Sequence, residues 1–208
     1  DQGTASVTSQ YDKAVVMDEF AGLDKGWNDP DMLMIGMNEL NDTMCRTHMA
    51  MWCMMNSPLM LGLDLRRVEK DDALYQIIAN KELIALNQDP LGIQAKRIFT
   101  TIASDVPDKD YITEHERCDI LAKPLADGSV ALCFINLSDH EWNERLSVTS
   151  EQIVKAIGDK MKFAEAFKNA KTYTVTNLWT GEHKEQNGCF EVGQLQACES
   201  ITLRVTPV

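Results

Sequence analysis

The amino-acid sequence predicts an α/β segment over residues 1–92 followed by an all-β segment over residues 93–208. Two observations lead to this fold class, a change in hydrophobic period and the distribution of turn residues. In the first segment, apolar residues recur three or four positions apart, and short, almost continuously apolar runs separate these stretches. From Lys96 onward, apolar residues alternate with a period of two between turns that contain Gly and Asp. The second segment is therefore expected to be an antiparallel β-sandwich.

Helix and strand patterns alternate in the first segment. Helical spacing of apolar residues predicts three helices: one over Ser9 to Gly22, one capped by Asp42 or Thr43, and one over Asp71 to Ala79. The run Met32 to Ile35 predicts a short buried strand. The run Leu59 to Leu65 predicts a parallel strand that is covered on both faces.

The second segment carries the signals of short antiparallel strands. Alternating residues on both sides of the turn Asp127-Gly128 predict a β-hairpin, and further strands are expected near Tyr173 to Asn177 and Ile201 to Val205. Between residues 149 and 169, apolar residues return to helical spacing with a break near Gly158. We therefore expect a helical insert within the sandwich.

Composition excludes several classes of partner. The chain has 208 residues, of which 20 are basic and 32 acidic, so its net charge is −12. An acidic surface argues against nucleic acid as a partner. The sequence contains no run of about 18 apolar residues, so no membrane span is predicted. The six cysteines have irregular spacing and are expected to be reduced. Together with the acidic charge, they favour a cytoplasmic location.

The first segment is not expected to be a complete domain. Two strands and their helices leave sheet edges and apolar helix faces uncovered, which is unfavourable in water. The sequence reads as part of a longer chain. We therefore expect either self-association or a further barrel segment on the N-terminal side as a partner.

Carboxylates are the densest polar signal in the first segment. Asp24, Asp29 and Asp31 surround Trp27, and Asp64 lies near the end of the second predicted strand. Side chains at the carboxyl ends of parallel strands line the sites of α/β barrels. An aromatic ring beside carboxylates suits a sugar, whose hydroxyls need acceptors and whose CH face packs on an indole. The alternative is that these carboxylates only cap and shape the loop.

Metal and cofactor chemistry find little support in the sequence. Asp29-Pro30-Asp31 has the spacing of a cation-binding pair, but no Gly-rich phosphate loop accompanies it. Cys45, His48 and Cys53 lie on one predicted helix without a fourth ligand, so a core histidine with satisfied hydrogen bonds and two buried thiols are the simpler interpretation. No metal and no cofactor are expected.

Four segments in a fixed order resemble a known family. The segments are GWNDPDMLMIG at 26–36, RTHMAMWCMMNSPLMLGLDL at 46–65, NQDPLG at 87–92 and KPLADGSVALCFIN at 123–136. Together they resemble the C-terminal portion of the melibiase-type glycoside hydrolases, the family of α-galactosidases and α-N-acetylgalactosaminidases. The resemblance implies that residues 1–92 are the last two β/α units of a (β/α)8 catalytic barrel. Residues 93–208 would then be the β-sandwich that follows the barrel.

The resemblance also implies a function and a set of site residues. Members of the family remove terminal α-linked galactose, or a related sugar, by retaining hydrolysis with two aspartates. Both aspartates come from earlier strands and have no matching position here, so no catalytic residue is assigned and the chain alone is expected to be inactive. Asp31 and Met32 match pocket-lining positions, and Trp27 and Asp29 are their neighbours. The alternative is a non-catalytic sugar-binding or assembly module from a truncated or split gene.

Overall fold

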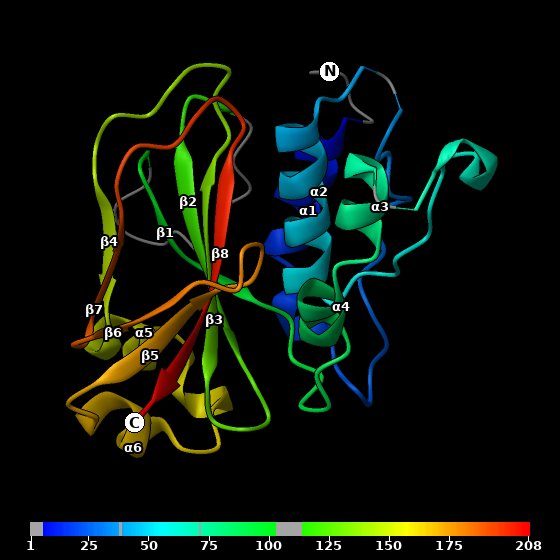
Figure 1. The fold of residues 1–208 in the computed structure, drawn as a ribbon. Helices are drawn as coiled ribbons and strands as arrows, with labels where there is room; N and C mark the ends of the chain where they lie inside the picture. Colours follow the sequence, from blue (N-terminus) through cyan, green and yellow to red (C-terminus); the bar gives the residue numbers. More distant parts are fainter. Residues whose placement is uncertain (1–5, 38, 71, 103–113) are drawn as a thin grey trace.

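A six-stranded antiparallel sheet lies at the centre of the molecule, with a helical layer on one face and the rest of a β-sandwich on the other (Figure 1). The computed structural model describes residues 6–37, 39–70, 72–102 and 114–208. The strands follow the order β1, β2, β3, β8, β5 and β6 across the sheet. Their bounds are Lys96–Thr100 for β1, Cys118–Pro124 for β2, Val130–Asn136 for β3, Ser200–Pro207 for β8, Tyr173–Asn177 for β5 and His183–Gln186 for β6.

The hairpin of β2 and β3 is the most deeply buried part of this sheet. All residues of both strands are buried, and they pair from Cys118 with Asn136 to Pro124 with Val130. The connecting turn contains Gly128 at φ +89°, a conformation in which a residue with a Cβ is strained. Alternate side chains of the hairpin pack against the helical layer and against the second sheet. The predicted hairpin and antiparallel sandwich are therefore confirmed.

The second sheet and the helical insert cover the outer face of the hairpin. This sheet consists of β4 (Leu146–Thr149) and β7 (Cys189–Val192). The insert consists of α5 (Ser150–Ile157), the 3-10 helix η3 (Gly158–Lys160) and α6 (Ala164–Asn169). A reciprocal cap between Thr149 and Gln152 starts α5. The insert and its break at Gly158 occur where the periodicity predicts them.

The helical layer is built around one buried helix, α2 (Asp42–Met54), which lies between the sheet and two shorter helices (Figure 1). The other members of this layer are α1 (Val7–Val15), η1 (Asp18–Phe20), η2 (Leu65–Arg67), α3 (Ala73–Ile78) and α4 (Lys81–Asn87). Two predicted details are wrong. The first helix ends at Val15 instead of continuing to Gly22, and the side chain of Asn41, not Asp42 or Thr43, caps α2. Asp71, where the third helix was expected to begin, lies outside the described residues.

The two predicted strands of the first segment are reduced to a single parallel bridge between Leu33 and Leu61. The Leu33 amide donates to the Met60 carbonyl at 2.7 Å, and the Gly62 amide donates to the Leu33 carbonyl at 3.0 Å. The order of strand, helix and parallel strand is as predicted. The burial of Leu59 to Leu65 on both faces is wrong, because Met60 is 67% exposed and Leu65 is 59% exposed. No described strand lies beside this run to extend its pairing or cover its outer face.

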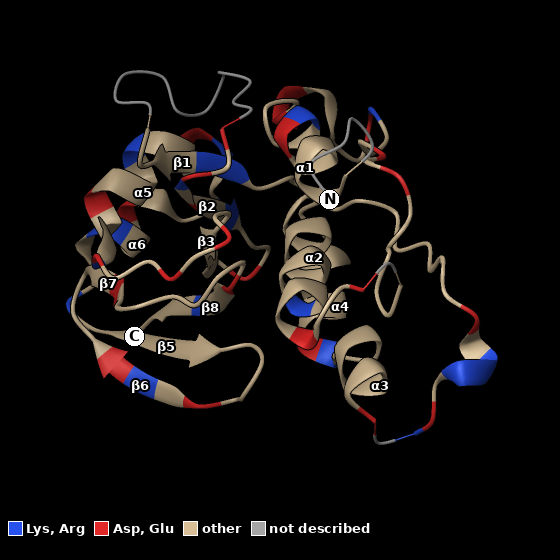
Figure 2. Cartoon of the chain, turned by 90° about the horizontal axis from the view of Figure 1, so that it is seen from above, with Lys and Arg blue, Asp and Glu red and all other residues tan. Residues whose placement is uncertain are grey.

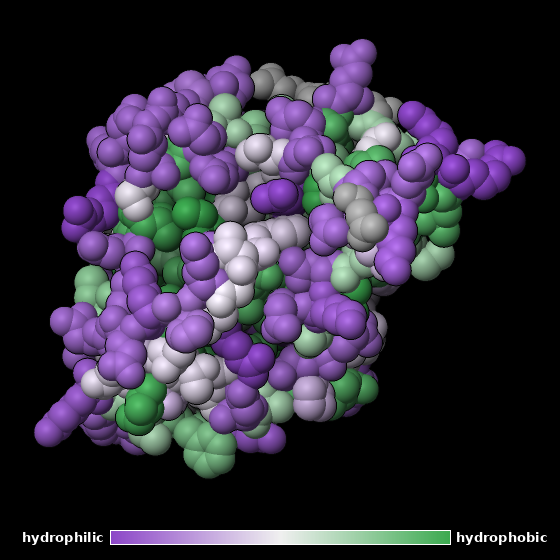
Figure 3. All heavy atoms as spheres, in the orientation of Figure 1, coloured by the Kyte–Doolittle hydropathy of each residue, from purple (hydrophilic) through white to green (hydrophobic). Residues whose placement is uncertain are grey.

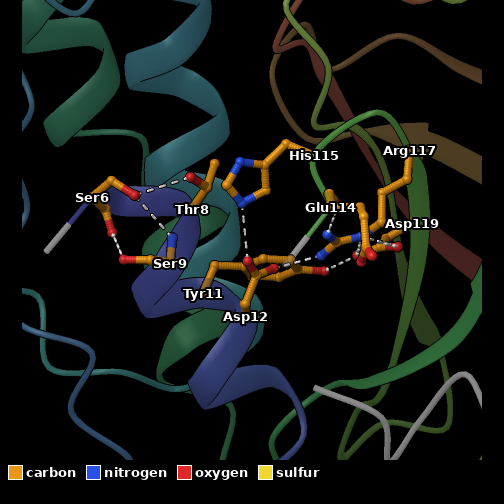
Figure 4. A network of polar contacts seen from close by, with 9 residues as sticks. All are labelled: Ser6, Thr8, Ser9, Tyr11, Asp12, Glu114, His115, Arg117 and Asp119. Carbon is orange, nitrogen blue, oxygen red and sulfur yellow. Dashed lines mark hydrogen bonds and ion pairs between the residues drawn. The ribbon is translucent and has the colours of Figure 1, made fainter. Parts of the chain in front are cut away.

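A buried ion cluster joins α1 to the start of β2 (Figure 4). In this α1–β2 ion cluster, the Arg117 guanidinium contacts the Asp12 carboxylate at 2.5 Å and the Asp119 carboxylate at 3.1 Å. The Tyr11 hydroxyl donates to Asp119 at 3.0 Å, and His115 reaches Asp12 at 3.1 Å from the edge of the cluster. Burial alone would lower the pKa of Arg117, but the two carboxylates raise it above its usual range, so the guanidinium stays charged.

A second buried contact links the sandwich to the chain around α2. Lys123 on β2 is fully buried, and its ammonium group donates to the Asn56 side chain and to the Ile93 carbonyl. Burial lowers the pKa of Lys123 to about 8. The amide of Asn56 in turn donates to the Asn87 carbonyl at 2.9 Å. The helical layer and the sandwich therefore share a polar interface in addition to their apolar core.

Charged residues are distributed over both parts of the molecule (Figure 2), and hydrophilic side chains cover most of the face shown in Figure 3. No helix among the described residues is long and apolar enough to cross a membrane. Large apolar side chains are nevertheless exposed on the helical layer: Met17, Phe20, Leu23, Trp27, Met32, Met60, Leu61 and Leu65. These eight residues are called the exposed apolar set below.

Candidate functional site

The loop that carries the candidate residues starts at a tight turn. Gly22 and Gly26 exchange backbone hydrogen bonds of 2.9 Å, and Gly26 has φ +95°. Asn28 then fixes the start of the loop, because its side-chain amide donates to the Met17 carbonyl and to the Gln94 side chain, each at 2.8 Å. Between these anchors, the Trp27 side chain is 42% exposed.

The indole of Trp27 lies against Gly92, at the beginning of the connection to the sandwich. A Cβ at Gly92 would stand 3.2 Å from the ring of Trp27 and 2.6 Å from the side chain of Leu23. Gly92 has φ +63°, so glycine meets both a conformational and a steric requirement there. This contact packs the ring of Trp27 against the chain that leads to the sandwich.

Asp31 has an unusual backbone conformation for a residue with a side chain, with φ +78°. Its amide donates to the Asp29 carboxylate at 3.0 Å, and its own carboxylate accepts the Met32 amide at 2.7 Å. Its carbonyl accepts the indole N–H of Trp52 at 2.9 Å. The left-handed region is unfavourable for a residue with a Cβ, although less so for aspartate than for most, and these contacts hold Asp31 in it. Both aspartates remain exposed to solvent.

Met32 follows directly and is 42% exposed. Its sulfur would stand 2.7 Å from a Cβ at Gly62, which shows how closely the thioether packs on the second chain segment of the parallel bridge. The next residue, Leu33, forms the bridge itself. The loop therefore presents two carboxylates, an indole and a thioether at the Leu33–Leu61 bridge.

The structure brings Trp27, Asp29, Asp31 and Met32 onto one exposed loop, and their roles in sugar contact stay predictions. A cavity of about 240 Å³ lies between α1, α2 and the sandwich, but none of the four residues lines it. Asp64, near the end of the second run, is engaged by Arg66 through contacts of 2.7–3.2 Å. This pairing lowers the pKa of the Asp64 carboxyl, so Asp64 is an ion-paired cap of η2.

His48 is a core histidine, as predicted, but the expected hydrogen bonds of its ring are not found among the described residues. It is 1% exposed, and its ring lies 4.1 Å from the ring of Trp52 in an edge-to-face arrangement. Neither ring nitrogen has a hydrogen-bond partner among the described residues. Burial lowers the pKa of His48 to about 4, so the ring is neutral at pH 7.

The thiols near His48 do not form a metal site with it. Cys45 and Cys53 are free and buried, and burial raises the pKa of both. Among the described residues, the group with ligand atoms close enough for a metal ion is Glu116, Asp139 and His140, and all three are exposed. The His140 ring contacts Glu116 at 3.2 Å, which is the geometry of a surface ion pair.

Two family models match the chain, one that ends before β1 and one that begins just before β2. A model described as alpha galactosidase A matches residues 5–89, and a model described as the alpha galactosidase C-terminal beta sandwich domain matches residues 115–205. The chain belongs to the melibiase family. It comprises part of the melibiase catalytic domain followed by the antiparallel β-sandwich, in agreement with the change of period in the sequence.

Individual melibiases resemble between about half and nearly all of the chain. It is 30% identical to alpha-galactosidase A of Cellvibrio japonicus over 204 residues, which is 96% of this chain and 45% of that protein. It is 36% identical to the alpha-N-acetylgalactosaminidase of Gallus gallus over 121 residues, 58% of this chain and 26% of that protein. The α-galactosidase structure from Saccharomyces cerevisiae with raffinose has a TM-score of 0.78 at 20% identity and covers 98% of this chain and 52% of its own. The chain thus spans about half the length of its melibiase relatives or less.

The sequence alone does not indicate several contacts that shape the melibiase loop. Trp52 lies on the helix predicted after Asp42 or Thr43, but its hydrogen bond to a residue 21 positions earlier has no local signal. Asn28 belongs to the segment at 26–36, while its partner Gln94 lies 66 positions further along the chain. The carboxamide of Gln94 is buried and also donates to the Ala14 carbonyl at 2.8 Å. Pairings of this kind become visible only in three dimensions.

The left-handed conformation of Asp31 leads to a stability prediction. Asp31→Gly is expected to have a free energy of unfolding about 1 kcal/mol higher than Asp31→Ala, because only glycine adopts positive φ without a steric penalty. Urea unfolding of the two variants followed by circular dichroism measures the difference. Equal stability of the two variants would show that the chain does not hold residue 31 in this conformation.

Proposed function

We propose that the chain is the C-terminal section of a retaining glycoside hydrolase that removes terminal α-linked galactose or a related sugar. The observation that supports this most directly is the loop from Trp27 to Met32, on which an indole, two carboxylates and a thioether face solvent at the start of the parallel bridge. In this proposal, Asp31 accepts a hydrogen bond from a sugar hydroxyl and Met32 forms an apolar wall. Trp27 and Asp29 shape the loop beside them.

The reacting carboxylates are proposed to lie outside the 208 residues. Retaining hydrolysis needs a nucleophile and an acid/base about 5–5.5 Å apart. In the loop, one oxygen each of Asp29 and Asp31 already accepts a backbone amide at 3.0 Å and 2.7 Å. Asp64 is paired with Arg66. The carboxylates of this region thus serve the loop and a helix cap, and their arrangement supports binding rather than nucleophilic attack.

The exposed apolar set supports a partner that completes the barrel. Met60, Leu61 and Leu65 lie at or close to the parallel bridge between Leu33 and Leu61, where a further barrel strand would pair and cover them. Soluble monomers rarely leave large contiguous apolar areas uncovered. We propose a preceding barrel segment as the covering element, with an α-galactoside as the substrate of the assembled protein. Self-association is the competing arrangement.

Hydrolysis of p-nitrophenyl α-D-galactopyranoside tests the assignment. The 208-residue chain alone is expected to release nitrophenol at the rate of the buffer blank. A chain that also carries an upstream barrel section is expected to hydrolyse the substrate, with kcat/KM at least about tenfold lower in Asp31→Asn, because a neutral amide is a weaker acceptor than a carboxylate.

Two outcomes would contradict this proposal. The first is hydrolysis by the 208 residues alone that Asp31→Asn abolishes, since the reacting group would then lie in the loop. The second is an active longer chain in which Asp31→Asn has no effect. Light scattering on the same preparations gives the mass of the 208-residue species, and a dimer would favour the competing arrangement for the exposed apolar set. The N-acetylgalactosaminide substrate, run in parallel, reports the preference at the 2-position.

A further inference from the structure

The backbone of Asp31 is fixed from two independent parts of the molecule. Within the loop, the Asp29 carboxylate holds the Asp31 amide at 3.0 Å. From α2, the Trp52 indole holds the Asp31 carbonyl at 2.9 Å. We propose that Trp52 is a positioning residue that, together with Asp29, holds Asp31 in its left-handed conformation and so aims its carboxylate at a galactoside hydroxyl. The sugar part of this inference rests on the proposed function.

The strain at Asp31 is the first argument. Glycine would adopt φ +78° at no steric cost, whereas the Cβ of aspartate disfavours this region, although less than in most other residues. Strained residues persist only where their surroundings over-determine them, and they cluster at functional sites. One carboxylate oxygen of Asp31 is bound to the Met32 amide at 2.7 Å, which sets the direction of the side chain. The exposed carboxylate therefore has a defined orientation and can accept a further hydrogen bond.

The rigidity of Trp52 is the second argument. Its side chain is 1% exposed, and the ring of His48 packs edge-to-face against it at 4.1 Å. Its carbonyl accepts the Ser57 amide at 3.0 Å, so the backbone at the end of α2 is also fixed. Because the indole N–H is held in this way, its hydrogen bond fixes the Asp31 carbonyl relative to α2. An interaction partner that is already ordered adds little entropic cost when the sugar binds.

A purely structural role for Trp52 makes a different prediction. A buried indole N–H needs an acceptor, and the Asp31 carbonyl could serve only that need. In that case the indole N–H would keep its hydrogen bond to the Asp31 carbonyl even when the Asp29 carboxylate no longer accepts the Asp31 amide. In a positioning role, removal of the Asp29 carboxylate releases the Asp31 peptide, and the indole N–H loses its acceptor.

The test is the ¹⁵N–¹H spectrum of the 208-residue chain, in which Trp52→Phe identifies the Trp52 indole signal. Asp29→Ala is expected to shift this signal and to accelerate its hydrogen–deuterium exchange about tenfold, the range for loss of one hydrogen bond. Asp64→Ala is the matched control, because Asp64 accepts the amide two residues ahead at 3.0 Å in the same way but caps η2. It is expected to leave the Trp52 signal unchanged. An unchanged signal in Asp29→Ala overturns the coupling.

A titration with methyl α-D-galactopyranoside separates this inference from the proposed function. In the wild type, the Met32 amide is expected to shift in a saturable way, and Trp52→Phe is expected to raise the apparent Kd about tenfold. Equal Kd values in the two proteins would overturn the positioning role while leaving sugar binding at this loop intact. No shift in the wild type would overturn the sugar contact of both proposals, and the Asp29→Ala experiment would then decide the coupling alone. Should Trp52→Phe fail to fold, Asp29→Ala takes its place in the titration with the same expectation.

Discussion

Arg117→Met is expected to lower the free energy of unfolding by about 3–5 kcal/mol, because it removes the guanidinium that contacts both buried carboxylates of the α1–β2 ion cluster. Asp12 is 1% exposed and Asp119 is fully buried, so water cannot replace the guanidinium. Breaking such a pair costs far more than the pair itself contributes, since the remaining charges stay desolvated. Urea unfolding at pH 7, monitored by circular dichroism, measures the change.

An exposed arginine provides the matched control for this experiment. Arg145 contacts Glu191 at 3.0 Å with a side chain that is 68% exposed, and Arg145→Met is expected to cost less than about 1 kcal/mol. A compensated variant that combines Arg117→Met with Asp12→Asn and Asp119→Asn is expected to recover part of the loss, because it removes the unpaired charges. Equal effects of Arg117→Met and Arg145→Met would contradict the structural importance of the cluster.

The free energy of unfolding is expected to fall by about 3 kcal/mol as the pH decreases from 6.5 to 4, owing to His48. Burial lowers the pKa of His48 to about 4 in the folded chain, whereas an unfolded histidine titrates near 6.5. Below pH 6.5 the unfolded state therefore binds a proton that the folded state does not, and the stability that neutral His48 allows is lost progressively. At about 1.4 kcal/mol per pH unit, the interval amounts to about 3 kcal/mol.

His48→Leu tests this origin, because it keeps an apolar side chain in the core and removes the titrating group. Urea midpoints measured at half-unit steps between pH 7 and pH 4 are expected to vary much less in His48→Leu than in the wild type. His183, which is exposed on β6, supplies the control variant His183→Leu, expected to retain the pH dependence of the wild type. A steep dependence that persists in His48→Leu would assign the effect to other groups.

The parts of the fold that local sequence determines were predictable. Period-two alternation around Asp127-Gly128 identified the β2–β3 hairpin, and helical spacing identified α2 and the insert at 149–169. The resemblance of the segment at 26–36 led to the family, which the two domain matches confirm. These features depend on neighbours a few residues apart, so one sequence contains them.

The remaining features depend on contacts between distant residues. The run Leu59 to Leu65 has the composition of a buried strand, but burial needs a covering layer that the described residues do not supply. Arg117 and Asp12 are 105 positions apart, and nothing in either neighbourhood indicates that they meet. Asp31 appeared as a candidate through its motif, while its left-handed backbone and the donor from Trp52 have no local pattern.

The burial of the β2–β3 hairpin on both faces limits where this protein can be truncated and which of its parts can be transferred to another protein. Leu121, Cys133 and Ile135 point toward α2, while Ile120, Leu132 and Phe134 point toward the second sheet. A sandwich transferred to another protein without the helices would expose the first set to solvent as an apolar patch. A truncated or recombined protein that folds must therefore keep α1, α2 and the sandwich together, with its fusion points outside these elements.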